Sequence, residues 1–137
     1  MKTSSYFIYR GPGRIGISLG TPRRIPAGYQ LYRTLSPRRD MLRLPYGHYR
    51  DIFFRDILGP LDPQKVADEL QRLAGEFEPV MLCFERPPFT PTNWCHRRMV
   101  AEWFADKLGF DVPEWWNGHI FERGGGAAPP TPGGTGR

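Results

Sequence analysis

Two short stretches of this 137-residue chain hold the side-chain types that nucleophilic and acid–base chemistry needs. One is VMLCFE at residues 80–85, and the other is WCHRR at residues 94–98. Together they contain both cysteines of the chain, one of its three histidines, a glutamate and two arginines. A thiol can attack or bind a metal, a carboxyl or imidazole can move a proton, and a guanidinium can hold an anion. We therefore predict that the functional site lies where these two stretches meet.

The first stretch is predicted to be a buried strand that delivers Cys83 and Glu85 near its end. Residues 80–84 are apolar without the polar alternation of a half-exposed strand. A continuous apolar run of this length is typical of a strand covered on both faces. The loop of residues 87–93 contains three prolines, so we expect it to be stiff.

The second stretch is predicted to open a helix, capped by Asn93 or Cys95. In the first turn of a helix, the free backbone N–H groups and the helix dipole favour an anion. The same turn, with arginines nearby, should lower the pKa of a thiol. We therefore predict Cys95, Glu85 and His96 as catalytic residues. Arg97 is predicted to bind an anionic group of the ligand.

Two other interpretations of these residues stay open. The first is a zinc site whose ligands would be Cys83, Glu85, Cys95 and His96. Against it, the spacing matches no C-x-x-C pair, and neighbouring Cys95 and His96 would have to splay to reach one ion, so we predict no metal and no cofactor. The second is a structural cluster in which Glu85 pairs with Arg97 to hold the helix to the strand. For Cys83 we favour such a structural role, as a small buried side chain.

The elements around these stretches predict an α/β domain over residues 1–123, with two or three layers, a mostly parallel sheet and flanking helices. Residues 124–137 are nearly all Gly, Pro, Ala and Thr, so we predict a disordered tail there. The clearest helix start is Asp62 followed by Pro63. We predict strands at residues 5–9, 14–19, 80–84 and 110–112, and helices at residues 40–44, 49–58, 63–74 and after residue 95.

The net charge of +5 is distributed unevenly along the chain. Residues 1–58 contain eleven Lys or Arg and three Asp or Glu, a net +8, whereas residues 59–137 carry −3. A basic half of this kind can attract an anionic small molecule or nucleic acid, and a solvated arginine-rich surface is the alternative. Because ligands collect beyond the carboxyl ends of parallel strands, Ser18, Thr21 and Arg23 are further candidates for ligand binding. A basic surface loop is the alternative for these three.

Composition argues against a disordered chain and against a membrane protein. Hydrophobic residues make up 39% of the chain, which suits a globular domain. No apolar run approaches the roughly 20 residues that span a bilayer, and we recognise no secretory signal. Two cysteines in such a chain suggest free thiols in the reducing cytoplasm.

The pattern Leu82-Cys-x-Glu85, a proline-bearing loop and then Cys95-His-Arg97 at the start of an amphipathic helix resembles the bacterial family called domain of unknown function 488. The resemblance extends over about residues 14–116. It implies a compact α/β domain with the motif at the carboxyl edge of its sheet, and it implies no particular activity. The long proline-rich loop and the arginine-rich first half depart from the family's pattern, as expected of a diverged subfamily.

The sequence thus predicts an enzyme or ligand-binding protein that acts on a phosphorylated or nucleotide-like molecule. The alternative is a nucleic-acid-binding accessory protein that uses the arginine-rich half. Four tyrosines in that half could stack on bases, and they are Tyr29, Tyr32, Tyr46 and Tyr49. A third possibility is a scaffold protein with a tryptophan-rich interface near the C-terminus.

Overall fold

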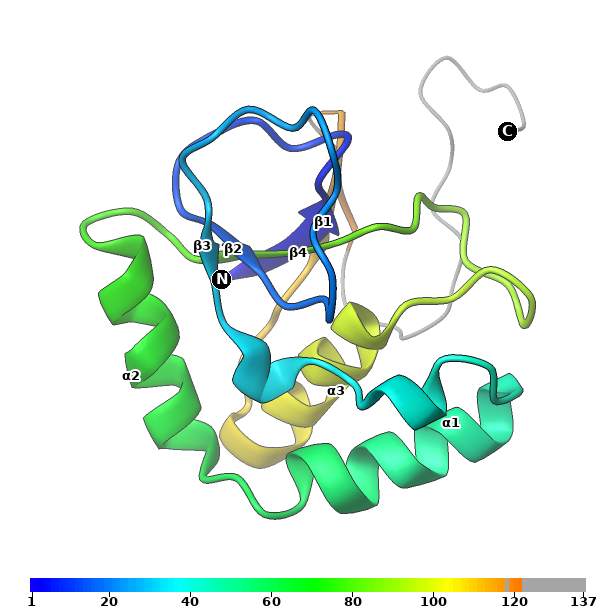
Figure 1. Cartoon of the computed structure of the whole chain (residues 1–137). Coiled ribbons are helices and arrows are strands. Elements are labelled where there is room, and N and C mark those ends of the chain that lie inside the picture. Colours follow the sequence, from blue (N-terminus) through cyan, green and yellow to red (C-terminus); the bar gives the residue numbers. More distant parts are fainter. Residues whose placement is uncertain (118, 122–137) are drawn as a thin grey trace.

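The computed structural model describes residues 1–117 and 119–121, and it has an α/β architecture (Figure 1). Its strands are β1 (Lys2–Ser5), β2 (Arg14–Gly16), β3 (Gln30–Leu31), β4 (Val80–Cys83), β5 (Glu114–Trp116) and β6 (His119–Phe121). They form one sheet in the order β3-β2-β4-β1-β5-β6. Strands β1 to β5 are parallel, and β6 is antiparallel to β5 at one edge. The predicted α/β class with a mostly parallel sheet and flanking helices is confirmed.

The helices gather on one side of this sheet (Figure 1). They are η1 (Arg33–Leu35), η2 (Arg39–Met41), α1 (Tyr46–Ile52), η3 (Phe53–Leu58), α2 (Pro63–Ala74) and α3 (His96–Leu108), and η3 is a π-helical continuation of α1. Helix α2 contacts β2, α3 contacts β1 and β4, and the two helices contact each other. They therefore share one face of the sheet and enclose the main core with it. None of the helices in the described part of the chain is long and apolar enough to cross a membrane.

Strand β4 is buried on both of its faces, as its apolar sequence predicted. Met81 belongs to the main core under the helices. Val80 and Leu82 point the other way and join a second apolar cluster with Tyr6. That cluster also receives Tyr29 and other side chains of the loops before and after β2. Helices thus cover one face of the sheet and loops cover the other.

The starts of the two long helices follow from their caps. Asp62 Oδ1 accepts hydrogen bonds from the backbone N–H groups of Gln64, at 3.0 Å, and Lys65, at 3.3 Å, with Pro63 in the first helical position. This is the predicted start of α2. Helix α3 begins after Cys95, and it ends before Gly109, whose φ of 70° is in the left-handed region that glycine adopts most easily.

Several predicted boundaries are wrong, mainly at the two ends of the domain. The first strand lies at residues 2–5 rather than 5–9, because the hydroxyl groups of Thr3 and Ser4 are satisfied inside the sheet by Glu114 and the Trp115 carbonyl. The last predicted strand, at residues 110–112, is replaced by β5 beyond Pro113. The two-residue strand β3 was not predicted. The predicted boundary at residue 123 and the tail lie outside the described residues.

Candidate functional site

A cavity of about 480 Å³ opens at the carboxyl ends of β2 and β4, beside the start of α3. Three segments supply most of its lining: residues 18–20 after β2, residues 83–85 at the end of β4, and residues 92–96 at the start of α3. Tyr49 of α1 and Leu42 also contribute to its wall. The two stretches that sequence analysis singled out therefore meet at this cavity, at the sheet edge where α/β domains bind ligands.

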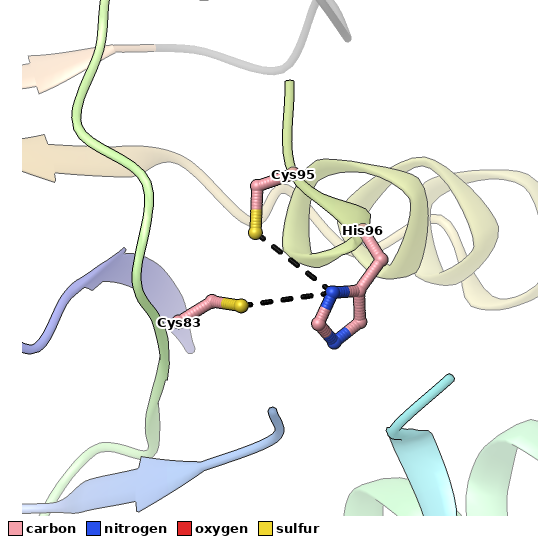
Figure 2. Close-up of side chains that lie close together, drawn as sticks. All are labelled: Cys83, Cys95 and His96. Carbon is pink, nitrogen blue, oxygen red and sulfur yellow. Dashed lines mark hydrogen bonds between the residues drawn. The ribbon is translucent and has the colours of Figure 1, made fainter. Parts of the chain in front are cut away.

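Cys83, Cys95 and His96 form a tight cluster in the lining of the cavity (Figure 2). Figure 2 shows both sulfur atoms directed at the same ring nitrogen of His96. Its Nδ1 lies 3.6 Å from Cys83 Sγ and 3.9 Å from Cys95 Sγ. The three atoms all lie within 4.8 Å of one another, and all three residues are buried. Cys83, which we had predicted to be a structural side chain, is thus a member of the cluster.

A hydrogen bond on the far side of the ring fixes the orientation of His96. Its Nε2 lies 2.8 Å from the backbone carbonyl oxygen of Ile17. A carbonyl can only accept, so Nε2 carries a proton, and in the neutral ring Nδ1 keeps a free lone pair. The ring of Phe53 packs edge to face against the imidazole, with 5.4 Å between the ring centroids. The free nitrogen is therefore held toward the two sulfur atoms.

Cys95 reaches the same point because it lies outside the helix that His96 begins. As the cap residue it has extended backbone, with φ −144° and ψ 140°, and its sulfur accepts a hydrogen bond from the backbone N–H of Arg97 at 3.5 Å. At this extended-to-helical step the side chains of Cys95 and His96 come together, with 3.9 Å between Cys95 Sγ and His96 Nδ1. The splaying that sequence analysis counted against a shared site is thus provided by the cap.

The pKa values of the two thiols are shifted in opposite directions. Burial by itself would raise the pKa of Cys95, but the hydrogen bond from Cys83 and the charges of Arg97 and His96 hold that pKa well below its usual range. Burial and the neighbouring Cys95 raise the pKa of Cys83. Burial acts to lower the pKa of His96, and the hydrogen bond and charge of Cys95 outweigh it, so the pKa is raised. Cys95 is therefore the more acidic thiol, paired with an imidazole.

Glu85 lines the cavity beside this cluster. Burial, followed by the charge of Cys95, raises the pKa of its carboxyl group to about 7. A carboxyl group with such a pKa can both give and accept a proton near neutral pH. Cys95, His96 and Glu85, the three predicted catalytic residues, all line the same cavity.

Arg97 does not line the cavity. Its side chain is fully buried, and Nε and Nη2 donate to the Glu114 carboxylate at 3.1 and 2.9 Å. Nη2 also donates to the backbone carbonyl of Glu85, at 2.8 Å, so the ion pair that we had considered with the Glu85 side chain is not formed. The guanidinium lies 4.9 Å from the centre of the Phe89 ring. This environment argues against the anion-binding role predicted for Arg97 and favours a role in holding α3 to the sheet.

Of the three ligand-binding candidates predicted after β2, only one lies at the cavity. Ser18 lines the cavity, but its hydroxyl group already accepts from the Tyr6 hydroxyl at 2.7 Å and donates to the Gly20 carbonyl. Thr21 and Arg23 are exposed and are not part of the lining. Sequence analysis missed Glu114, the partner of Arg97. An acidic residue inside the apolar sequence VPEWW was the available signal.

No protein-family model matches this chain, and no curated protein or solved structure is significantly similar to it. The resemblance to domain of unknown function 488 therefore stays a prediction.

Proposed function

We propose that this protein is an enzyme that acts on a small phosphorylated or nucleotide-like molecule in the cavity at the end of β4. The observation that carries the proposal is the convergence of a thiol, an imidazole and a carboxyl group on one cavity, from Cys95, His96 and Glu85. Buried polar groups cost free energy unless they are paired. Three reactive groups beside an open cavity, at the edge of a parallel sheet, are more typical of an active site than of a core.

The size of the cavity and its surroundings support the choice of ligand. About 480 Å³ lies within the range of roughly 300–1,000 Å³ that small-molecule sites occupy. Helix α3, of 13 residues, begins at the cavity wall, and its positive dipole end favours an anionic group there. Thr92 and Asn93 also belong to the lining, and Asn93 Nδ2 there donates to the backbone carbonyls of Arg86 and Pro88. The Arg97 guanidinium is paired with Glu114 and lies outside the lining, so it is not a contact for the ligand.

We assign the proton transfer to Glu85 and the contact with the reacting group to the cluster of Cys95 and His96. Both thiols of this site are free, and neither takes part in a disulfide in the described chain. A site that works with free thiols suits a reducing compartment such as the cytoplasm.

The test is ligand-dependent melting of the full-length protein against nucleotides, sugar phosphates and inorganic phosphate. A ligand at a hundred times its Kd should stabilise the fold by about 2.7 kcal/mol, which raises Tm by several degrees. Gly20→Leu should abolish the shift by adding bulk in the cavity lining. Gly47→Leu is the matched control, because a Cβ at either glycine meets no atom within 4 Å but Gly47 lies outside the lining. If no ligand of these classes raises Tm, or if both variants respond alike, the proposal is wrong.

A second candidate function, nucleic-acid binding, is favoured by the exposed arginines before α1. Six of them form no salt bridge within the described chain, and they are Arg10, Arg23, Arg24, Arg33, Arg39 and Arg43. The tyrosines predicted to stack on bases give less support, because Tyr32 and Tyr49 are buried. Binding of a labelled single strand should weaken by about 0.7 log units per phosphate contact for each tenfold rise in salt. Binding that does not change with salt would contradict this candidate.

A further inference from the structure

We infer that Cys83, Cys95 and His96 form a zinc-binding site with its fourth coordination position open to the cavity. The inference goes beyond the proposed function, because an ion can bind there whether or not a substrate does. It also revises our expectation from the sequence that no metal is bound.

The distances fit one tetrahedral ion. Zinc binds cysteine sulfur at about 2.3 Å and histidine nitrogen at about 2.0–2.1 Å, which places the two atoms roughly 3.6 Å apart in a tetrahedral site. His96 Nδ1 lies 3.6 Å from Cys83 Sγ and 3.9 Å from Cys95 Sγ. All three donor atoms lie within 4.8 Å of one another. A zinc ion therefore needs only small side-chain adjustments to reach all three.

The histidine is held as zinc ligands usually are. A metal-bound imidazole donates its other N–H to a carboxylate or carbonyl, which fixes the ring and the tautomer. His96 Nε2 does this to the Ile17 carbonyl at 2.8 Å, so the lone pair of Nδ1 faces the sulfur atoms. The two Nδ1–Sγ distances are also close to the edges of a zinc tetrahedron.

The three ligands come from regular elements rather than from a flexible loop. Cys83 ends strand β4, Cys95 caps α3, and His96 is the first residue of that helix (Figure 2). Strand β4 is paired on both sides, with β1 and β2. The site is thus held in its binding geometry by the sheet and by the helix cap.

The open position faces the same cavity that Glu85 lines. Three protein ligands and one open position are typical of catalytic zinc, whereas structural zinc has four protein ligands. Binding converts both thiols to thiolates and releases their protons. The sulfur atoms are then ligands, so in the zinc-bound protein the contact with the reacting group, assigned above to Cys95 and His96, would pass to the metal and its water.

Cobalt titration of the full-length protein, purified under reducing conditions without chelator, tests the site. We expect one equivalent of Co²⁺ to bind, with the visible d–d bands of a tetrahedral ion and thiolate-to-cobalt charge-transfer absorption. Added zinc should displace the cobalt. His96→Gln and Cys83→Ser should each weaken binding by more than the roughly 10–100-fold that loss of an outer-shell partner causes. His48→Gln, which removes an exposed histidine outside the cavity lining, should bind as the parent does.

A second measurement needs no variant. Zinc should raise the Tm of the parent protein, and a chelator should reverse the rise. The inference is overturned if the parent shows no tetrahedral cobalt bands and no zinc-dependent rise in Tm, or if the cobalt spectrum survives in His96→Gln. Zinc binding without any nucleotide or phosphate response would overturn only the proposed substrate class. A ligand response in fully chelated protein that binds no zinc would overturn only the metal site.

Discussion

Glu114 should be essential to the fold, because it is the counter-charge of a fully buried arginine. Its side chain is 4% exposed, and it accepts two hydrogen bonds from Arg97, at 3.1 and 2.9 Å, and one from the Thr3 hydroxyl at 2.6 Å. Arg97 Nη1 has no hydrogen-bond partner among the described residues. Burial lowers the pKa of the neighbouring Arg98, and the charge of Glu114 opposes that effect. Among the described residues, no buried side-chain oxygen lacks a hydrogen-bond partner, so none is free to replace this carboxylate.

Glu114→Gln keeps the shape of the side chain but removes its charge. Removing one partner of a buried ion pair costs about 3–5 kcal/mol, because the other charge is left uncompensated. That is a large part of the roughly 5–15 kcal/mol by which a domain is stable. The matched control is Glu102→Gln, since Glu102 also pairs with an arginine, Arg50, but is 41% exposed. An exposed pair contributes about 1 kcal/mol or less.

Urea unfolding followed by circular dichroism gives both free energies of unfolding. The double variant Arg97→Met/Glu114→Leu provides a further check, because removing both charges should recover most of the loss seen in Glu114→Gln. The reasoning is refuted if Glu114→Gln loses no more stability than Glu102→Gln. It is also refuted if the double variant is less stable than the single one.

Three further predictions concern single side chains. Asp62→Ala should lower the free energy of unfolding by about 1 kcal/mol in urea, because the capping hydrogen bonds at the start of α2 are lost. Leu70→Ala should cost about 2–5 kcal/mol in the same assay, since Leu70 is fully buried in the main core, and a loss below 1 kcal/mol would contradict that packing. Because the pKa of Glu85 is raised from 4.5 to about 7, the folded state binds its proton more tightly, and stability should fall as the pH rises from about 4.5 to 7. Glu85→Gln should remove that part of the pH dependence in chelated protein. If the urea midpoint of Glu85→Gln varies with pH as that of the parent does, this prediction is wrong.

The parts of the fold that depend on neighbouring residues were predictable. The start of α2 follows from Asp62 and Pro63, which act within one turn of helix. The burial of β4 on both faces follows from its own apolar sequence. The cap of α3 at Cys95 was one of two predicted positions.

The parts that depend on distant residues were not predictable. Strand β1 consists of polar residues, Lys2–Ser5, which look unsuited to a central strand. The hydroxyl groups of Thr3 and Ser4 are tolerated there because Glu114 and the Trp115 carbonyl, more than a hundred residues away, accept their hydrogen bonds. The alternative that paired Arg97 with Glu85 was wrong for the same reason, since only the order of strands brings β5, with Glu114, beside β1.

The candidate site was likewise predictable in its local features and not in those that depend on the tertiary structure. The two stretches that should supply it were found from residue types alone, and Cys95, His96 and Glu85 line one cavity. The membership of Cys83 and the convergence of Cys95 with His96 depend on the backbone angles of a single cap residue and on the Ile17 carbonyl. No sequence pattern specifies those two features.

Backbone amide NMR of the full-length protein, titrated with a nucleoside monophosphate, tests the central claim most directly. If the cavity is the functional site, the chemical-shift changes should gather at residues 17–20, 83–85 and 92–97, around its lining. Changes confined to the arginine-rich residues 23–43, or no saturable changes at any amide, would contradict the account.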